Sequence, residues 1–189
     1  MEIPNEYRVG PPRGLAVWGV SRLPSNVVSD LDKRALHKEL QAALERAREA
    51  AAASQRRTQD AATHSENRAE GDKDMRATET SYVARGQAQR VQSLDEDLVR
   101  LAGMPIRDFA EGDPIGLSAI VTMEADSGST TVFVASAGGG EKLTIGGKMI
   151  AVVTSSAPLG KALIGARVGD EVTVKRGDKN ELIEIVGVR

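Results

Sequence analysis

Acidic side chains cluster in the segment SENRAEGDKD, residues 65–74. It carries Glu66, Glu70, Asp72 and Asp74 within ten residues, and helical patterns stand on both sides of it. Two interpretations follow from the residues alone. The cluster is either a solvated turn or a tip that carries carboxylates into the active site of another molecule.

Two long helices are predicted to hold this cluster between them. Small and apolar residues recur at alternating spacings of four and three, which is the seam of a coiled coil. In the first helix they are Leu36, Leu40, Ala43, Ala47, Ala50 and Ser54, and in the second Ala77, Thr80, Ala84, Gln87, Val91, Leu94, Leu98 and Leu101. Each helix has about 27–30 residues, so it is about 40–45 Å long.

The short polar connection between the helices favours an antiparallel hairpin over residues 30–103, with its acidic tip near 63–76. The alternative is that each helix pairs with a second chain. Residues 1–29 are rich in Pro, Gly and Ser and are predicted to be a flexible leader, with one short strand at 15–20.

The pattern changes after Gly103 and Pro105, where β-branched residues and glycine-rich turns predominate. This predicts a small, mostly antiparallel β domain over residues 106–189. The expected strands are 117–124, 130–135, 149–154, 170–175 and 181–188. One helix is expected within 155–165, capped by Ser156, with Pro158 in its first turn and Gly165 at its end. The fold class is therefore α+β.

The composition excludes several classes of protein. A formal charge of −2 gives no general attraction to nucleic acid or to anionic membranes. The chain has no cysteine, which excludes disulfides and thiolate metal sites and agrees with a cytoplasmic location. Its longest apolar run, residues 15–20, is far too short to span a bilayer.

Several motifs of self-contained enzymes are absent. The chain lacks a phosphate-binding GxxxxGK[ST] loop and an HExxH motif, and His37 and His64 are too far apart to form a metal site. The glycine-rich segment 138–140 lies between strands, so we expect a flexible connection there. Phe109 and Phe133 are the only aromatic residues of the β domain, too few for the walls of a prolyl isomerase pocket.

The segment SSAPLGKALIGARVGDEVTV, residues 155–174, resembles the C-terminal signature of the GreA/GreB family of transcript-cleavage factors. The order of elements from residue 30 to residue 189 agrees with that resemblance. It implies an FKBP-like β domain that docks at the secondary channel of RNA polymerase. It also implies a hairpin that reaches the catalytic centre, where the polymerase itself cleaves backtracked RNA. Such a factor has no active site of its own, contacts nascent RNA indirectly and acts as a monomer.

Family cleavage factors typically carry an Asp-Leu-Ser-Glu-Asn tip, and this chain offers two alignments with it. Counting from the second helix places Asp72 at the first acid and Met75 at the second, with Asp74 beside it. Matching the letters instead places Glu66 at the second acid and Thr63 at the first. The choice between the alignments stays open.

The resemblance implies that Asp72 and Asp74 help to hold an Mg²⁺ ion shared with the polymerase, with Glu66 and Glu70 in support. Mg²⁺ prefers oxygen ligands and is commonly bound by one or two carboxylates together with phosphates. A pair of metal ions stabilises the attacking and leaving oxygens of phosphodiester hydrolysis. Lys73 stands between the two aspartates and competes with a metal for them.

The resemblance also implies that the β domain supplies the polymerase-docking surface, at Pro158, Leu159, Lys161 and Arg167. The alternative is that this segment is only a structural corner. Three hypotheses result: a factor that stimulates RNA cleavage, a non-cleaving protein that occupies the channel, and an adaptor for some other partner.

Two residues of the second helix also need an explanation. We expect Tyr82 to pack against the first helix. Gly86 costs about 1 kcal/mol relative to alanine inside a helix. It marks a close approach of the helices, a bend or a contact with the channel wall.

Overall fold

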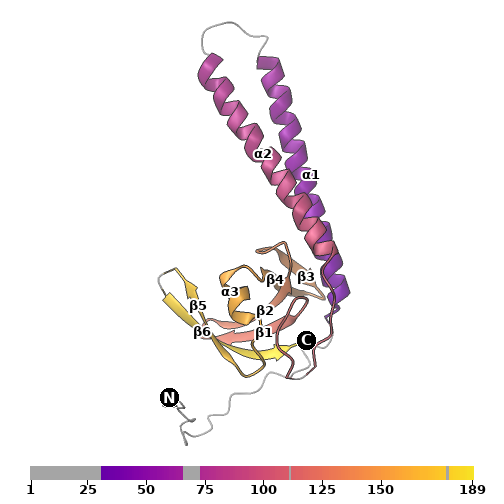
Figure 1. The fold of residues 1–189 in the computed structure, drawn as a ribbon, viewed down its shortest axis with the longest axis vertical. Coiled ribbons are helices and arrows are strands. Elements are labelled where there is room, and N and C mark those ends of the chain that lie inside the picture. Colours follow the sequence, from indigo (N-terminus) through magenta and orange to yellow (C-terminus); the bar gives the residue numbers. More distant parts are fainter. Residues whose placement is uncertain (1–30, 66–72, 111, 178) are drawn as a thin grey trace, which may run out of the picture.

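The computed structural model describes residues 31–65, 73–110, 112–177 and 179–189, without the side chains of 61–65, 73–81, 176 and 179. Helix α1 (Lys33–Ser65) and helix α2 (Lys73–Ala102) form a long arm. The chain continues into β1 (Ile120–Ala125), β2 (Gly128–Ala135), β3 (Lys142–Ile145), β4 (Lys148–Thr154), α3 (Pro158–Leu163), β5 (Glu171–Arg176) and β6 (Lys179–Val188). Figure 1 shows the arm standing on the β domain. The predicted leader lies outside the described residues.

The arm is an antiparallel hairpin, as the sequence predicts (Figure 1). Its helices contain 33 and 30 residues, which makes them about 50 and 45 Å long. The predicted seam is right at Leu36, Leu40 and Leu94, which are all buried. It is wrong at Ala50, which is exposed, whereas Ala51 packs against the core.

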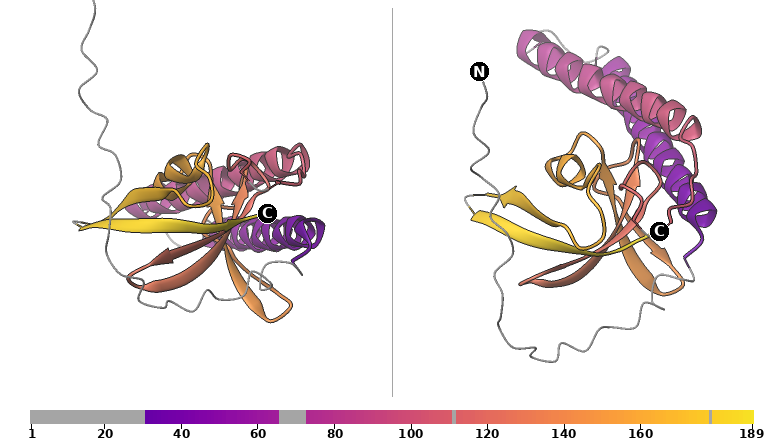
Figure 2. Two further views of the ribbon diagram at one scale, coloured as in Figure 1. Left: turned by 90° about the horizontal axis from the view of Figure 1, so that it is seen from below. Right: turned by 60° about the horizontal axis from the view of Figure 1, so that its bottom comes forward.

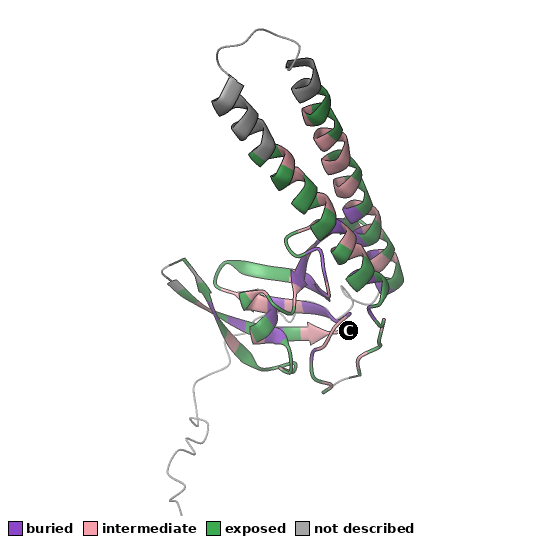
Figure 3. Ribbon diagram, turned by 45° about the horizontal axis from the view of Figure 1, so that its top comes forward, coloured by how far each residue is buried: buried purple, intermediate pink, exposed green. Residues whose placement is uncertain are grey.

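The seam shifts because the first turns of α1 pack on the sheet as well as on α2. Leu36, Leu40 and Leu44 are buried at spacings of four, so the buried face of α1 is broader at its base than a coiled-coil seam. Figure 3 shows that burial is concentrated at this base, while the next turns of the arm, as far as its side chains are described, are mostly exposed or half-buried.

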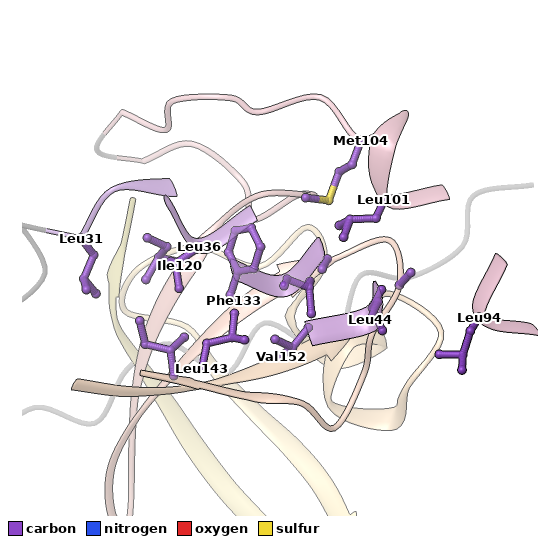
Figure 4. Packing of buried hydrophobic residues seen from close by; sticks show 14 residues of the cluster. Leu31, Leu36, Leu44, Leu94, Leu101, Met104, Ile120, Phe133, Leu143 and Val152 are labelled. Atoms are coloured by element: carbon purple, nitrogen blue, oxygen red, sulfur yellow. The ribbon is translucent and has the colours of Figure 1, made fainter. Parts of the chain in front are cut away.

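The base of the hairpin and the sheet share one hydrophobic core. Leu36, Leu101 and Met104 pack with Phe133 and other sheet residues, as Figure 4 shows. Phe133 is fully buried. Because a single core connects both parts, the sheet sets the direction in which the arm points.

The six strands form one sheet in the order β3-β4-β2-β1-β6-β5. Strands β2 and β4 pair in parallel and all the other neighbours pair antiparallel. This confirms the predicted α+β fold class, a helical hairpin followed by a β domain with one short helix. Strand β3 was not predicted. It pairs with β4 through a two-residue turn, Gly146–Gly147, in which both residues have positive φ (58° and 75°).

Helix α3 packs on the sheet face opposite the hairpin base. Val121 and Val132 belong to the core beneath α3, whereas their neighbours Ile120 and Phe133 belong to the core beneath the hairpin. Alternate residues of a strand point to opposite faces, so both faces carry a core. Figure 2 shows α3 and the hairpin base over different parts of the twisted sheet.

The predicted Ser156 cap is wrong. The cap residue of α3 is Ala157, which makes no side-chain capping bond, and the Ser156 hydroxyl lies 3.2 Å from that of Thr154. The helix starts later than expected because Pro158 supplies its first residue, where the missing N–H costs nothing. Gly165 follows the helix with φ +86°, as predicted for a terminating glycine. No helix in the described part of the chain is long and apolar enough to cross a membrane.

Candidate functional site

Helix α1 ends at Ser65 and α2 begins at Lys73 at the end of the hairpin farthest from the β domain (Figure 1). Glu66, Glu70 and Asp72 lie outside the described residues. Asp74 lies in the first turn of α2, but its side chain is outside the description. Their roles as metal ligands therefore stay predictions. Elsewhere in the described chain, no group of three or more His, Cys, Asp or Glu residues is placed to hold a metal ion.

Polar contacts join the two helices of the arm where the leucine seam ends. Arg48 on α1 forms an ion pair with Asp95 on α2, and this hydrogen bond raises the pKa of Arg48. Farther along the arm, the Gln87 amide donates to the Ser54 hydroxyl at 3.1 Å. Both contacts are polar and local to the interface, so they fix which residues of the two helices face each other.

The outer side of α2 carries residues that the fold does not use. Tyr82 is 68% exposed, so the expectation that it packs against α1 is wrong. Gly86 is exposed, and a Cβ added there would meet no atom within 4 Å. The helices therefore do not approach closely at Gly86, and α2 is continuous through it.

The four predicted docking residues gather at α3 and the loop after it. Pro158 and Lys161 are exposed, while Leu159 is half-buried against the core beneath α3. Arg167 is exposed and donates from its guanidinium to the carbonyl of Gly112. Leu159 and Arg167 thus make contacts within the domain, whereas the exposed Pro158 and Lys161 are more accessible to a partner.

Gly160 explains why this segment needs its Pro-Leu-Gly sequence. A Cβ at Gly160 would lie 1.9 Å from the backbone oxygen of Thr154. Only glycine allows the first turn of α3 to lie this close to the end of β4.

A buried lysine fastens α1 to the segment between the two parts of the chain. Lys33 is only 5% exposed and donates its Nζ hydrogen to the carbonyl of Arg107. Its Nζ also lies 4.6 Å from the centre of the Phe109 ring, a cation–π contact. The Arg107 N–H in turn donates to the hydroxyl of Ser118 at 2.8 Å. Ser118 is fully buried and adopts φ +67°, which is unusual for a residue other than glycine.

Burial lowers the pKa of Lys33, while the nearby Asp108 carboxylate opposes the change. A polar hollow of about 260 Å³ adjoins this lysine and is lined by Asp32, Arg34, Arg189 and others. The inward position of Lys33 was not predicted, because a lysine at a helix start gives no sign of burial. Its contacts at Arg107 and Phe109 are more than seventy residues away.

A second unpredicted feature lies on the part of the sheet that the hairpin leaves open. Glu124, Glu184 and Glu171 stand directly opposite one another on β1, β6 and β5. We call these three residues the glutamate row. Like charges at opposed positions of neighbouring strands destabilise a sheet. The exposed side chain of Leu182 lies two residues away on β6.

The β domain matches the model of a known protein family. Residues 112–189 match the family model "Transcription elongation factor, GreA/GreB, C-term". This match covers all six strands of the sheet as well as α3 and the predicted signature segment. The resemblance to the GreA/GreB family that the sequence predicts is therefore confirmed over these residues.

Solved structures give weaker likenesses over more of the chain. GreA factor homolog 1 (Gfh1) of Thermus thermophilus is 23% identical, with 81% of this chain and 94% of that chain covered and a TM-score of 0.32. Gfh1 of Thermus aquaticus is 22% identical, with coverage of 82% and 95% and a TM-score of 0.34. GreA/GreB from Nitrosomonas europaea is 24% identical, with coverage of 51% and 78% and a TM-score of 0.31. No curated protein sequence matches the chain. With such low TM-scores, these likenesses support no conclusion about function.

Proposed function

We propose that this protein is a transcription factor that binds RNA polymerase at its secondary channel and stimulates cleavage of backtracked RNA. The observation that carries the proposal is a GreA/GreB β domain joined through one core to a hairpin arm of about 45–50 Å. The β domain docks on the polymerase around Pro158 and Lys161. The arm then extends into the channel and presents its acidic tip to the catalytic centre.

In this proposal Asp72 and Asp74 contribute oxygen ligands to an Mg²⁺ ion that the polymerase and the RNA phosphates also hold. Glu66 and Glu70 support the negative charge of the tip. The arm supplies position rather than chemistry, because one or two carboxylates bind Mg²⁺ usefully only where other ligands complete the site. The polymerase performs the hydrolysis.

A second candidate function is favoured by the tip sequence. Lys73 lies between the two aspartates, and Met75 takes the place of the second acid in one alignment with the family tip. A cation at this point competes with a metal ion for the carboxylates. The chain would then occupy the channel and modulate the polymerase without stimulating cleavage.

The test is RNA cleavage in purified, backtracked elongation complexes with Mg²⁺. We expect the intact protein to shorten the RNA and Asp72→Ala/Asp74→Ala to abolish the shortening. Asp95→Ala is not a suitable control, because Asp95 pairs with Arg48. The exposed Glu96→Ala, on the same arm, provides the control. Binding without shortening by the intact protein would support the second function. Absence of binding would overturn both.

A further inference from the structure

The outer side of α2 presents four residues that face away from α1. They are Tyr82, Arg85, Gly86 and Gln89, and we call them the outer α2 face. Their spacing of i, i+3, i+4 and i+7 places them on one side of the helix. Residues 82, 85, 86 and 89 are exposed, whereas the intervening Gln87 turns inward and donates to Ser54.

The fold gives no internal reason for three of these residues. Tyr82 is 68% exposed, although the two phenylalanines of the chain are buried or half-buried. Gly86 weakens the helix, yet a Cβ there would meet nothing within 4 Å. The fold would therefore tolerate alanine at this position.

Arg85 differs from several other arginines of the arm, although Arg90 on α2 likewise has no ion pair within the described residues. Arg46, Arg48 and Arg56 on α1 each form an ion pair with an acidic side chain. No ion pair or hydrogen bond of the Arg85 side chain joins it to the described part of the protein. Its charge is available to an acidic group of another molecule.

We propose that the outer α2 face is a binding surface for an acidic protein segment of RNA polymerase. This inference rests on the proposed function, which brings the arm into contact with the polymerase. Tyrosine and arginine are enriched among the residues that contribute most to protein interfaces. Arg85 pairs with a carboxylate of the partner, and the Tyr82 ring packs beside it. At Gly86 the missing side chain lets the partner lie against the helix backbone.

The experiment measures the affinity of the full chain for RNA polymerase core enzyme together with its thermal stability. The variants are Gly86→Ala, Tyr82→Ala and Arg85→Gln. The control is Val99→Ala. Val99 is 73% exposed, about as much as Tyr82, and lies on α2 more than three turns closer to the base than Gly86.

Gly86→Ala separates binding from folding. We expect its melting temperature to rise by about 2–4 °C, since alanine favours the helix, and its affinity for the polymerase to fall about tenfold. Tyr82→Ala should weaken binding by a similar factor. Arg85→Gln should weaken it most at low salt, because added salt screens an exposed ion pair. Val99→Ala should bind like the unchanged protein.

Three results would overturn the inference. If the unchanged chain binds and all three variants bind as tightly, the outer α2 face is not an interface, while the proposed function stands. If the unchanged chain does not bind the polymerase, the proposed function fails and this inference fails with it. If Tyr82→Ala and Arg85→Gln weaken binding to single-stranded RNA but not binding to the polymerase, the partner is a nucleic acid and not an acidic protein segment.

Discussion

Among glycine-to-alanine substitutions near α3, the one at Gly160 should destabilise the β domain most. The added Cβ would lie 1.9 Å from the Thr154 oxygen, whereas real Cβ contacts are essentially never under 3.0 Å. The backbone must therefore separate by about 1.1 Å at this point, the difference of those two distances. The Cβ is fixed to the Gly160 backbone and the oxygen belongs to the Thr154 backbone, so neither atom can rotate away.

Overpacking of a tight site typically costs 1–3 kcal/mol, and we expect about 3 kcal/mol here because α3 itself must move. That corresponds to a fall of about 6–12 °C in melting temperature for a chain of this size. The assay is urea unfolding monitored by circular dichroism. Gly165→Ala should cost about 1 kcal/mol, because it strains a residue with φ +86° in open space.

Gly103→Ala is the matched control, because its Cβ would make only ordinary contacts, the nearest at 3.7 Å. The expected order of destabilisation is Gly160, then Gly165, then Gly103. A Gly160→Ala protein as stable as the Gly103→Ala protein would refute the close approach of α3 to the end of β4. It would also remove the physical reason given for the Pro-Leu-Gly sequence.

Two further predictions concern buried and opposed charges. Burial lowers the pKa of Lys33 below its ordinary value of 10.5, so the unfolded chain binds more protons as the pH approaches 10.5. The stability of the unchanged protein relative to Lys33→Met, measured by urea unfolding at a series of pH values, should therefore rise with pH in the alkaline range below 10.5. Glu184→Gln should raise the free energy of unfolding by about 0.2–1 kcal/mol at low salt, because it removes the central charge of the glutamate row. A loss of stability in Glu184→Gln would show that cations within the chain already offset that charge.

Local patterns were enough to predict most of the fold. The leucine and alanine spacing indicated the hairpin, since a helical period is set within a few residues. The β-branched runs indicated five of the strands. Strand β3 was missed because it has only four residues, although the Gly146–Gly147 pair after it is a typical hairpin turn.

Non-local contacts explain the features that could not be predicted. The segment 138–140 looked like a free connection, but Gly138 is buried, and a Cβ there would lie 2.7 Å from Leu40 of α1. The inward position of Lys33 likewise depends on Arg107 and Phe109, which no local pattern connects to it. Tyr82 was misplaced because it lies on the side of α2 that faces away from α1, whereas Ala84 and Gln87 are half-buried nearby.

The packing of the arm changes along its length, and this change suits a probe fixed at one end. Leucines bury the base against the sheet, and the Arg48–Asp95 pair follows beyond them. Farther out, the interface relies on alanine and on the Gln87–Ser54 hydrogen bond, and the Gln87 Oε1 atom is buried without a described partner. Fewer buried apolar contacts mean that less free energy opposes local opening. The direction of the arm is therefore set at the sheet, while the described part of the arm beyond Arg48 has fewer buried apolar contacts to hold its two helices together.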